Sequence, residues 1–131
     1  MKTLNLFLGS FLALFIISGC SSDDDNTNND NNLIIGVWSE YRHKVSNWNN
    51  EQWNIVTEPI TLEFQSNGTL IDRYDGVVEA VGTWLISGNT LIENWEDETI
   101  QSDILILNQT TLQVKETFDD GEWLIYEYKK E

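Results

Sequence analysis

Cysteine, proline and histidine each occur only once among the 131 residues of this sequence. Because Cys20 is the single cysteine, no disulfide can form within the chain, and the fold has to rest on its apolar core. His43 has no cysteine nucleophile to serve and belongs to no recognisable Ser/His/Asp arrangement, so we expect a surface histidine and no enzyme. No metal-ligand spacing and no phosphate-binding glycine loop occurs either, which predicts neither a metal nor a cofactor.

Positive charge is also scarce. Seven Lys and Arg oppose 22 Asp and Glu, which gives a formal net charge of −15. No basic stripe is evident, because the cations that follow Lys2 are scattered along the sequence at Arg42, Lys44, Arg73, Lys115, Lys129 and Lys130. A chain this acidic is repelled by nucleic acid and by anionic membrane surfaces, so we exclude a nucleic-acid partner.

The apolar stretch from Leu6 to Ile17 is too short for a membrane-spanning helix, which takes about 20 apolar residues. It follows Lys2 and ends in the sequence Ile17-Ser18-Gly19-Cys20. This arrangement resembles the lipobox of bacterial lipoproteins, with an ordinary secretory signal and a chance cysteine as the alternative. The resemblance implies that residues 1–19 are a signal peptide and that Cys20 becomes an acylated, palmitate-bearing membrane anchor.

Residues 20–32 follow as a polar segment. No apolar residue occurs between Ser21 and Asn32, so the segment cannot bury enough surface to offset its ordering entropy. We therefore expect a disordered acidic tether. The stretch Ser22-Asp23-Asp24-Asp25 resembles the surface-export signal of Bacteroidetes lipoproteins, which implies an outer-membrane protein displayed on the cell surface; a plain solvated spacer is the alternative.

Residues 33–131 are enough for one domain, and their short apolar stretches are separated by turn signals such as Asn67-Gly68 and Asp75-Gly76. This spacing predicts eight strands over residues 36–45, 60–64, 70–74, 78–87, 90–95, 99–107, 111–118 and 122–129. Short sequential connections favour an all-β fold, an antiparallel up-and-down meander that closes into a small barrel. A flattened two-sheet sandwich is the alternative.

Three Gly-x-Trp sequences, at residues 36–38, 82–84 and 121–123, place a tryptophan and a glycine on the same face of a strand. We expect Trp38 and Trp84 to pack in the core. With residues 62–69, 82–91, 105–112 and 123–129, these motifs resemble the lipocalin-like domain of Bacteroidetes lipoproteins, which implies an eight-stranded barrel over residues 33–131. Glu40 stands where that pattern has an apolar residue, and a bulge there would turn Tyr41 to the inner face.

Two functions from different classes fit this domain. The first is binding of a small apolar or amphipathic ligand in the barrel, with a packed core as its alternative. The expected lining residues share an inner, aromatic-rich face; they are Phe64, Trp84, Ile86, Leu112, Val114 and Phe118. The second is a surface adhesion or glycan contact through Trp48 and Trp53, which lie in a polar connection. The alternative is that these two rings fold back and cap one end of the barrel. Buried rings there favour a cap and exposed rings favour a contact surface.

Overall fold

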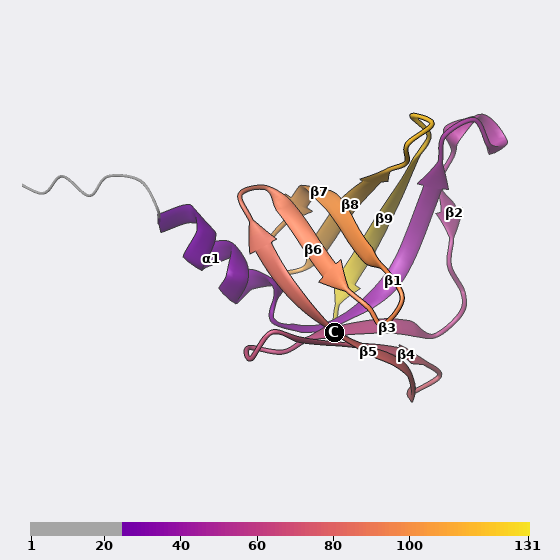
Figure 1. The fold of residues 1–131 in the computed structure, drawn as a ribbon. Coiled ribbons are helices and arrows are strands. Elements are labelled where there is room, and N and C mark those ends of the chain that lie inside the picture. The colour runs from indigo at the N-terminus through magenta and orange to yellow at the C-terminus, as the bar shows by residue number, and fades with distance from the viewer. Residues whose placement is uncertain (1–24) are drawn as a thin grey trace, which may run out of the picture.

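Nine β-strands and one α-helix make up residues 25–131, the part of the chain that this computed structural model describes (Figure 1). The helix α1 (Asp25–Ile34) precedes β1 (Gly36–Val45), and a 3₁₀ turn, η1 (Asn49–Glu51), follows β1. The remaining strands are β2 (Asn54–Ile55), β3 (Ile60–Phe64), β4 (Thr69–Tyr74), β5 (Val77–Ser87), β6 (Thr90–Asn94), β7 (Thr99–Leu107), β8 (Thr111–Thr117) and β9 (Trp123–Lys130). The predicted signal peptide and Cys20 lie outside the described residues.

The strands form one antiparallel sheet that closes on itself. Neighbouring strands follow one another in the order β1-β3-β4-β5-β6-β7-β8-β9, and β9 pairs back with β1 from Leu124↔Val45 to Lys130↔Trp38. This pairing confirms the predicted eight-stranded meander barrel and excludes the flattened sandwich. The short β2 is an extra strand that pairs with β1 at Arg42 and His43, inside the connection in which the sequence predicts no strand.

Local sequence explains the regular parts of the barrel. In β3, alternate residues face inward as predicted, with Leu62 8% and Phe64 1% exposed. The hairpin between β4 and β5 turns at Asp75 and Gly76, which have φ values of +50° and +76°. A two-residue hairpin loop takes positive φ at both positions, and Asp-Gly suits it, so this turn and its register follow directly from the sequence.

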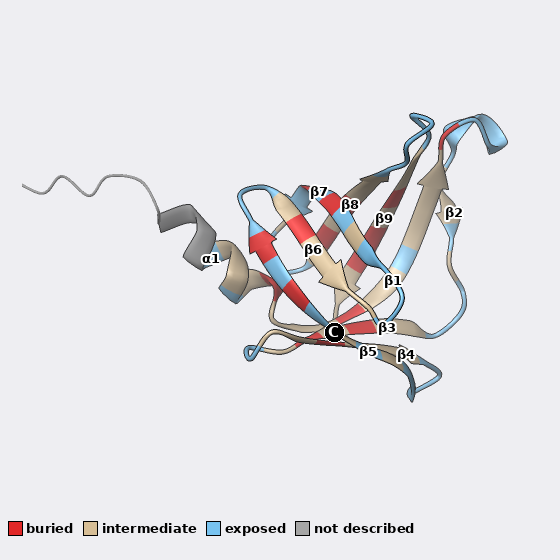
Figure 2. Cartoon of the chain, viewed as in Figure 1, coloured by how far each residue is buried: buried red, intermediate tan, exposed pale blue. Residues whose placement is uncertain are grey.

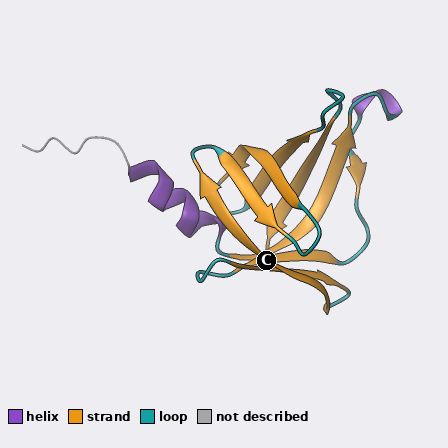
Figure 3. Ribbon diagram, viewed as in Figure 1, coloured by secondary structure: helices purple, strands orange, loops and turns teal. Residues whose placement is uncertain are grey.

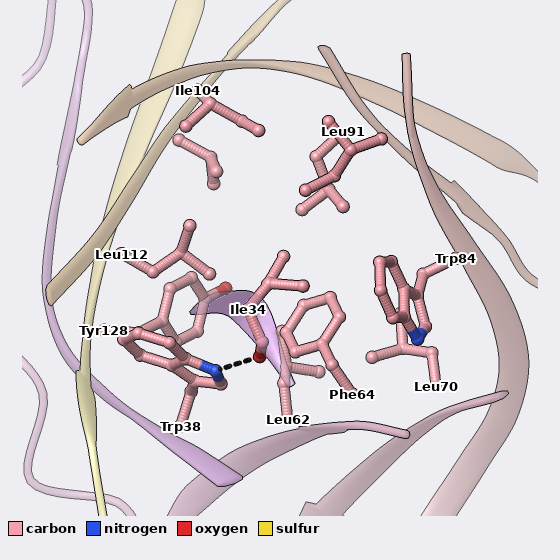
Figure 4. Close-up of a cluster of buried hydrophobic side chains, with 12 residues drawn as sticks. Ile34, Trp38, Leu62, Phe64, Leu70, Trp84, Leu91, Ile104, Leu112 and Tyr128 are labelled. Atoms are coloured by element: carbon pink, nitrogen blue, oxygen red, sulfur yellow. Dashed lines mark hydrogen bonds between the residues drawn. The ribbon is translucent and has the colours of Figure 1, made fainter. Parts of the chain in front are cut away.

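The apolar core fills the end of the barrel beside α1 (Figures 2 and 4). Trp38 and Trp84 belong to it, as predicted, with 0% and 8% of their surfaces exposed. The Trp84 ring meets Phe64 edge to face at a centroid distance of 5.7 Å, and its Nε1 donates a hydrogen bond to the Gln65 carbonyl oxygen. Buried indole nitrogens need such partners, so the tryptophans are positioned by hydrogen bonds as well as by packing.

The helix α1 corrects the prediction of disorder through Asn32, because residues 25–34 are helical (Figure 3). Asp and Asn are weak helix formers, so packing has to stabilise the last turn. Ile34 is fully buried at the centre of the apolar cluster, and its carbonyl oxygen accepts a 2.6 Å hydrogen bond from Trp38 Nε1 (Figure 4). Lys130 Nζ donates to the Leu33 carbonyl oxygen at 2.9 Å. The end of the predicted tether is therefore a plug for the barrel. No helix within residues 25–131 is long and apolar enough to cross a membrane.

We predict that Ile34→Ala lowers the free energy of unfolding by about 3 kcal/mol, because it opens a cavity in a closely packed core. Asn32→Ala, on the exposed side of the same turn, is the matched control and should change stability little. Urea unfolding followed by tryptophan fluorescence measures both. Equal stabilities of wild type and Ile34→Ala would mean that α1 is not part of the folded domain.

Candidate functional site

A cavity of about 380 Å³ occupies the barrel beyond the apolar core. Its walls come from all eight barrel strands and from the connection that follows β6. The lining residues are Glu40, Ile60, Leu62, Asp72, Ala80, Glu93, Trp95, Glu98, Ile100, Ser102, Val114, Glu116, Tyr126 and Tyr128. None of them is a lysine or an arginine, so the wall combines aromatic and aliphatic surface with carboxylates of one charge.

Strand periodicity explains why the carboxylates face inward. Successive inward positions on a strand lie two residues apart, and four strands that run in the same direction change from apolar to acidic along that face. Trp38 is followed by Glu40 on β1, Leu70 by Asp72 on β4, Leu91 by Glu93 on β6, and Val114 by Glu116 on β8. The barrel consequently has an apolar end that contains α1 and an acidic end that contains the cavity.

Glu93 is the most perturbed of these carboxylates. Burial raises its pKa to about 7 from an ordinary value of 4.5, and the charges of Glu116 and Asp72 act in the same direction. A hydrogen bond from Trp95 Nε1 at 3.4 Å opposes this rise. No salt bridge involves Glu93 within residues 25–131. At neutral pH, Glu93 is therefore poised between its neutral and ionised forms.

The neighbouring acids show the same influence to a smaller degree. Burial raises the pKa of Asp72 and of Glu116, and each rise is increased by a further carboxylate, Glu79 and Glu98 respectively. Glu40 has a partner, because its Oε1 lies 3.2 Å from His43 Nδ1. His43 is thus half-buried and bonded to a cavity residue, which differs from the surface position expected for it.

Aromatic rings line the other side of the cavity. Burial raises the pKa of Tyr126 to about 12 and raises that of Tyr128 well above its ordinary value, so both phenols are neutral hydrogen-bonding groups at physiological pH. Trp95 reaches the wall because Gly82 on the adjacent strand has no side chain. A Cβ at Gly82 would meet the Asn94 carbonyl oxygen and would lie 2.9 Å from the Trp95 ring. Gly82 therefore makes room for the ring of Trp95, and not for the ring of Trp84, the tryptophan of its own Gly-x-Trp sequence.

Only one of the six predicted lining residues, Val114, contacts the cavity. Phe64, Trp84, Ile86 and Leu112 belong to the packed core, and Trp84 and Ile86 also line a separate groove of about 320 Å³ beside the end of α1. Phe118 is 42% exposed, since β8 ends at Thr117 and the Phe118 N–H already bonds to the Glu122 carbonyl oxygen in the following turn. The other five predicted residues thus lie outside this cavity, because the prediction followed apolar side chains and much of the cavity wall is acidic.

Trp48 and Trp53 occupy different surroundings. Trp48 is 53% exposed and does not cap the barrel. Trp53 is half-buried on the outer face of the barrel, where Arg42 lies 4.2 Å from its ring centroid and Lys44 lies 5.0 Å from it. Only Trp48 therefore offers a free ring, whereas the predicted glycan contact relied on both.

Four of the cations that are scattered along the sequence lie on this outer face of β1, β8 and β9; they are Arg42, Lys44, Lys115 and Lys129. Arg42 and Lys129 form salt bridges with Glu127, which is 3% exposed. Burial alone would raise the pKa of Glu127, but hydrogen bonds from Arg42, Lys129 and Gln113 outweigh it and lower the pKa below its ordinary value. Arg42 and Lys129 are consequently paired with Glu127 outside the barrel, whereas the cavity wall has carboxylates and no lysine or arginine.

The expected bulge at Glu40 is present, because the pairing with β9 shifts register between Glu40 and Arg42. Glu40 nevertheless keeps its inward position, and Tyr41 is the residue turned outward, with 41% of its surface exposed. The shift brings Glu40 and His43, three residues apart, to the same side of the strand. A second register shift, between β4 and β5, directly follows Asp72.

Comparison with solved structures places this architecture among known folds. A lipocalin-like protein from Bacteroides uniformis matches with a TM-score of 0.59 and 12% sequence identity, over 75% of this chain and 98% of that chain. The chain has a lipocalin-like fold. A bovine odorant binding protein, a deswapped triple mutant, matches at 18% identity with a TM-score of 0.46, over 75% of this chain and 74% of that one. No family model matches the sequence, and comparison with curated proteins finds no relative.

The raised pKa of Glu93 makes stability depend on pH. The folded protein holds a proton on Glu93 up to about pH 7, whereas the unfolded chain releases it near the ordinary value of 4.5. The stabilising effect of holding this proton in the folded state is therefore fully present below about pH 4.5, and it is lost as the pH rises through about 7. We predict that wild type loses about 3 kcal/mol relative to Glu93→Gln between about pH 4.5 and about pH 8.

Urea unfolding across this pH range tests the prediction. Glu96→Gln, an exposed position in the turn after β6, removes the same charge and should keep the wild-type slope. Parallel pH profiles for wild type and Glu93→Gln would show that Glu93 has an ordinary pKa.

Proposed function

We propose that this protein is a lipid-anchored lipoprotein of the cell envelope that binds a small apolar or amphipathic molecule in the barrel cavity. The observation that carries the binding proposal is the cavity itself, about 380 Å³ with a mixed aromatic and polar wall. Ligand sites of small molecules start at about 300 Å³ and combine apolar surface with a few placed polar groups. Eight-stranded barrels are either filled by side chains or hold one small ligand, and the empty space here favours the second.

A glycan-contact function has less support. Sugar recognition through stacked rings requires exposed aromatic faces, and Trp53 already packs against Arg42 and Lys44. Trp48 alone remains available, on the loop between β1 and β2. The cavity supplies three aromatic residues together with polar groups that can orient a ligand, so binding inside the barrel is the better explanation of the residues present.

Filling the cavity should abolish binding. We predict that Ala80→Phe, which projects a ring into the cavity, weakens binding of the fluorescent probe N-phenyl-1-naphthylamine by about tenfold or more. Val81→Phe is the control, because Val81 is the next residue on β5 and is 58% exposed. Fluorescence titration of the full chain carrying Cys20→Ser measures both without competing detergent. Probe binding that is absent in the unsubstituted protein, or equal in Ala80→Phe, would contradict the proposal.

The anchor proposal depends on Cys20 and the lipobox-like sequence before it. Two or more acyl chains hold a protein stably on a membrane without a spanning helix, because each buried CH₂ contributes about 0.8 kcal/mol. The helix α1 begins at Asp25, and its ten residues extend about 15 Å. On this proposal the barrel is held at the outer membrane by an acyl anchor that precedes a structured plug, facing the cell exterior.

We predict that Cys20→Ser abolishes palmitate incorporation and leaves the barrel folded, since Cys20 precedes every described element. Replacing Asp23, Asp24 and Asp25 by alanine should keep the lipid and reduce surface display. Metabolic palmitate labelling and protease shaving of whole cells measure the two effects. Equal labelling of wild type and Cys20→Ser would end the lipoprotein proposal, and unchanged shaving would reduce the aspartates to a spacer.

A further inference from the structure

The cavity contains more negative charge than its own residues compensate. Five carboxylates line it, from Glu40, Asp72, Glu93, Glu98 and Glu116, and no lysine or arginine does. Within residues 25–131, only Glu40 among them has an ionisable partner, His43. A buried carboxylate without a counter-charge is costly, and proteins normally pair such groups or keep them neutral. The missing partner is therefore a candidate for the ligand itself.

We infer that the ligand of this cavity is an organic cation, a small amine or quaternary ammonium compound with an apolar body. This inference rests on the proposed binding function and names its substrate class. The ammonium group would lie against Glu93 and its neighbouring carboxylates, while the apolar body contacts Trp95, Tyr126 and Tyr128. Aromatic faces attract cations as well as apolar groups, so both parts of the wall select the same molecule.

The placement of the acids argues for an organic cation rather than a metal ion. No group of three His, Cys, Asp or Glu residues in the described chain converges closely enough to hold one metal. The carboxylates are instead distributed over β1, β4, β6, β8 and the connection after β6. A distributed charge of one sign suits a bulky cation, and it opposes fatty acids and other anions that would have to approach the same wall.

The backbone is also irregular beside two of these acids. Tyr41 is the extra residue of the shift after Glu40 on β1, whereas Glu79 on β5 is the extra residue of the shift opposite Asp72 on β4. Bulges re-aim side chains and are common near binding sites, which gives the position of Glu40 a reason independent of its charge. The shift at Glu40 also places His43 beside the cavity, where its ring meets Tyr126 edge to face at 6.1 Å.

Binding of a cation should become tighter as the pH rises. Glu93 has to be ionised to pair with an ammonium group, and burial keeps part of it protonated near neutral pH. The groups that face it are Glu40 and His43 from β1, Asp72 from β4, Glu98 before β7, Glu116 from β8, and Tyr126 and Tyr128 from β9. The tyrosines stay neutral over this range, because burial raises the pKa of both phenols.

Calorimetric titration with three probes of one shape tests the inference on the full chain carrying Cys20→Ser. The probes are phenylbutylamine, phenylbutanol and phenylbutanoate, which are cationic, neutral and anionic at neutral pH. We expect the amine to bind about tenfold tighter than the alcohol, and the anion to bind weakest. Glu93→Gln should remove most of the preference for the amine and flatten its pH dependence between about pH 5.5 and about pH 8.

Matched variants separate a specific site from general attraction to an acidic protein. Glu96→Gln removes the same charge outside the cavity and should bind the amine as the unsubstituted chain does. Glu116→Gln is a second cavity variant and should also weaken the amine selectively. Equal affinity for amine and alcohol would overturn the cation assignment and leave the proposed binding function intact. Equal loss in Glu96→Gln and Glu93→Gln would overturn it as well, and failure of all three probes would overturn both.

Discussion

The pairing of β1 with β9 is the constraint on which the rest of the structure depends. It joins the first and last strands of the barrel from Trp38↔Lys130 to Val45↔Leu124, so that no sheet edge remains between them. On the outside, buried Glu127 holds the seam through Arg42 on β1 and Gln113 on β8. On the inside, the same register sets Glu40 opposite Tyr128 in the wall of the cavity. The same strand pairing therefore closes the barrel and positions Glu40 and Tyr128 in the cavity wall.

The two ends of the barrel perform different physical tasks. At one end, Ile34 and Trp38 seal the interior with apolar packing and a hydrogen bond, which supplies stability. At the other end, inward carboxylates and phenols give the cavity a polar, hydrogen-bonding wall. Burying these groups lowers stability, as the raised pKa of Glu93 shows. The cavity wall has five carboxylates and no lysine or arginine, and this imbalance of charge is the basis on which we propose a cationic ligand.

The fold could be predicted from sequence because it depends on local signals. The turns at Asn67-Gly68 and Asp75-Gly76 and the alternation of β3 define strands and register without knowledge of distant residues. The site could not be predicted in the same way. Glu93 and Glu116 occupy inward positions of regular strands, yet a search for apolar lining residues passes over them, and Phe118 looks inward until the end of β8 is known. Because alternate residues of a strand share a face, counting two residues on from the inward-facing Leu91 would have identified Glu93 as an inward-facing acid. The helical plug depends on a tertiary hydrogen bond from Trp38, which composition alone does not reveal.

The protonation of Glu93 tests the central claim most directly, because it reports burial without a counter-charge at the position assigned to the cation. Side-chain carboxyl carbons of glutamate can be followed by NMR in a pH titration of the isotope-labelled protein, with Glu93→Gln to assign the signal. The account predicts a midpoint of about 7 for the free protein, and a lower midpoint once phenylbutylamine is bound. A midpoint near the ordinary value of 4.5 in the free protein, unchanged by the amine, would contradict it.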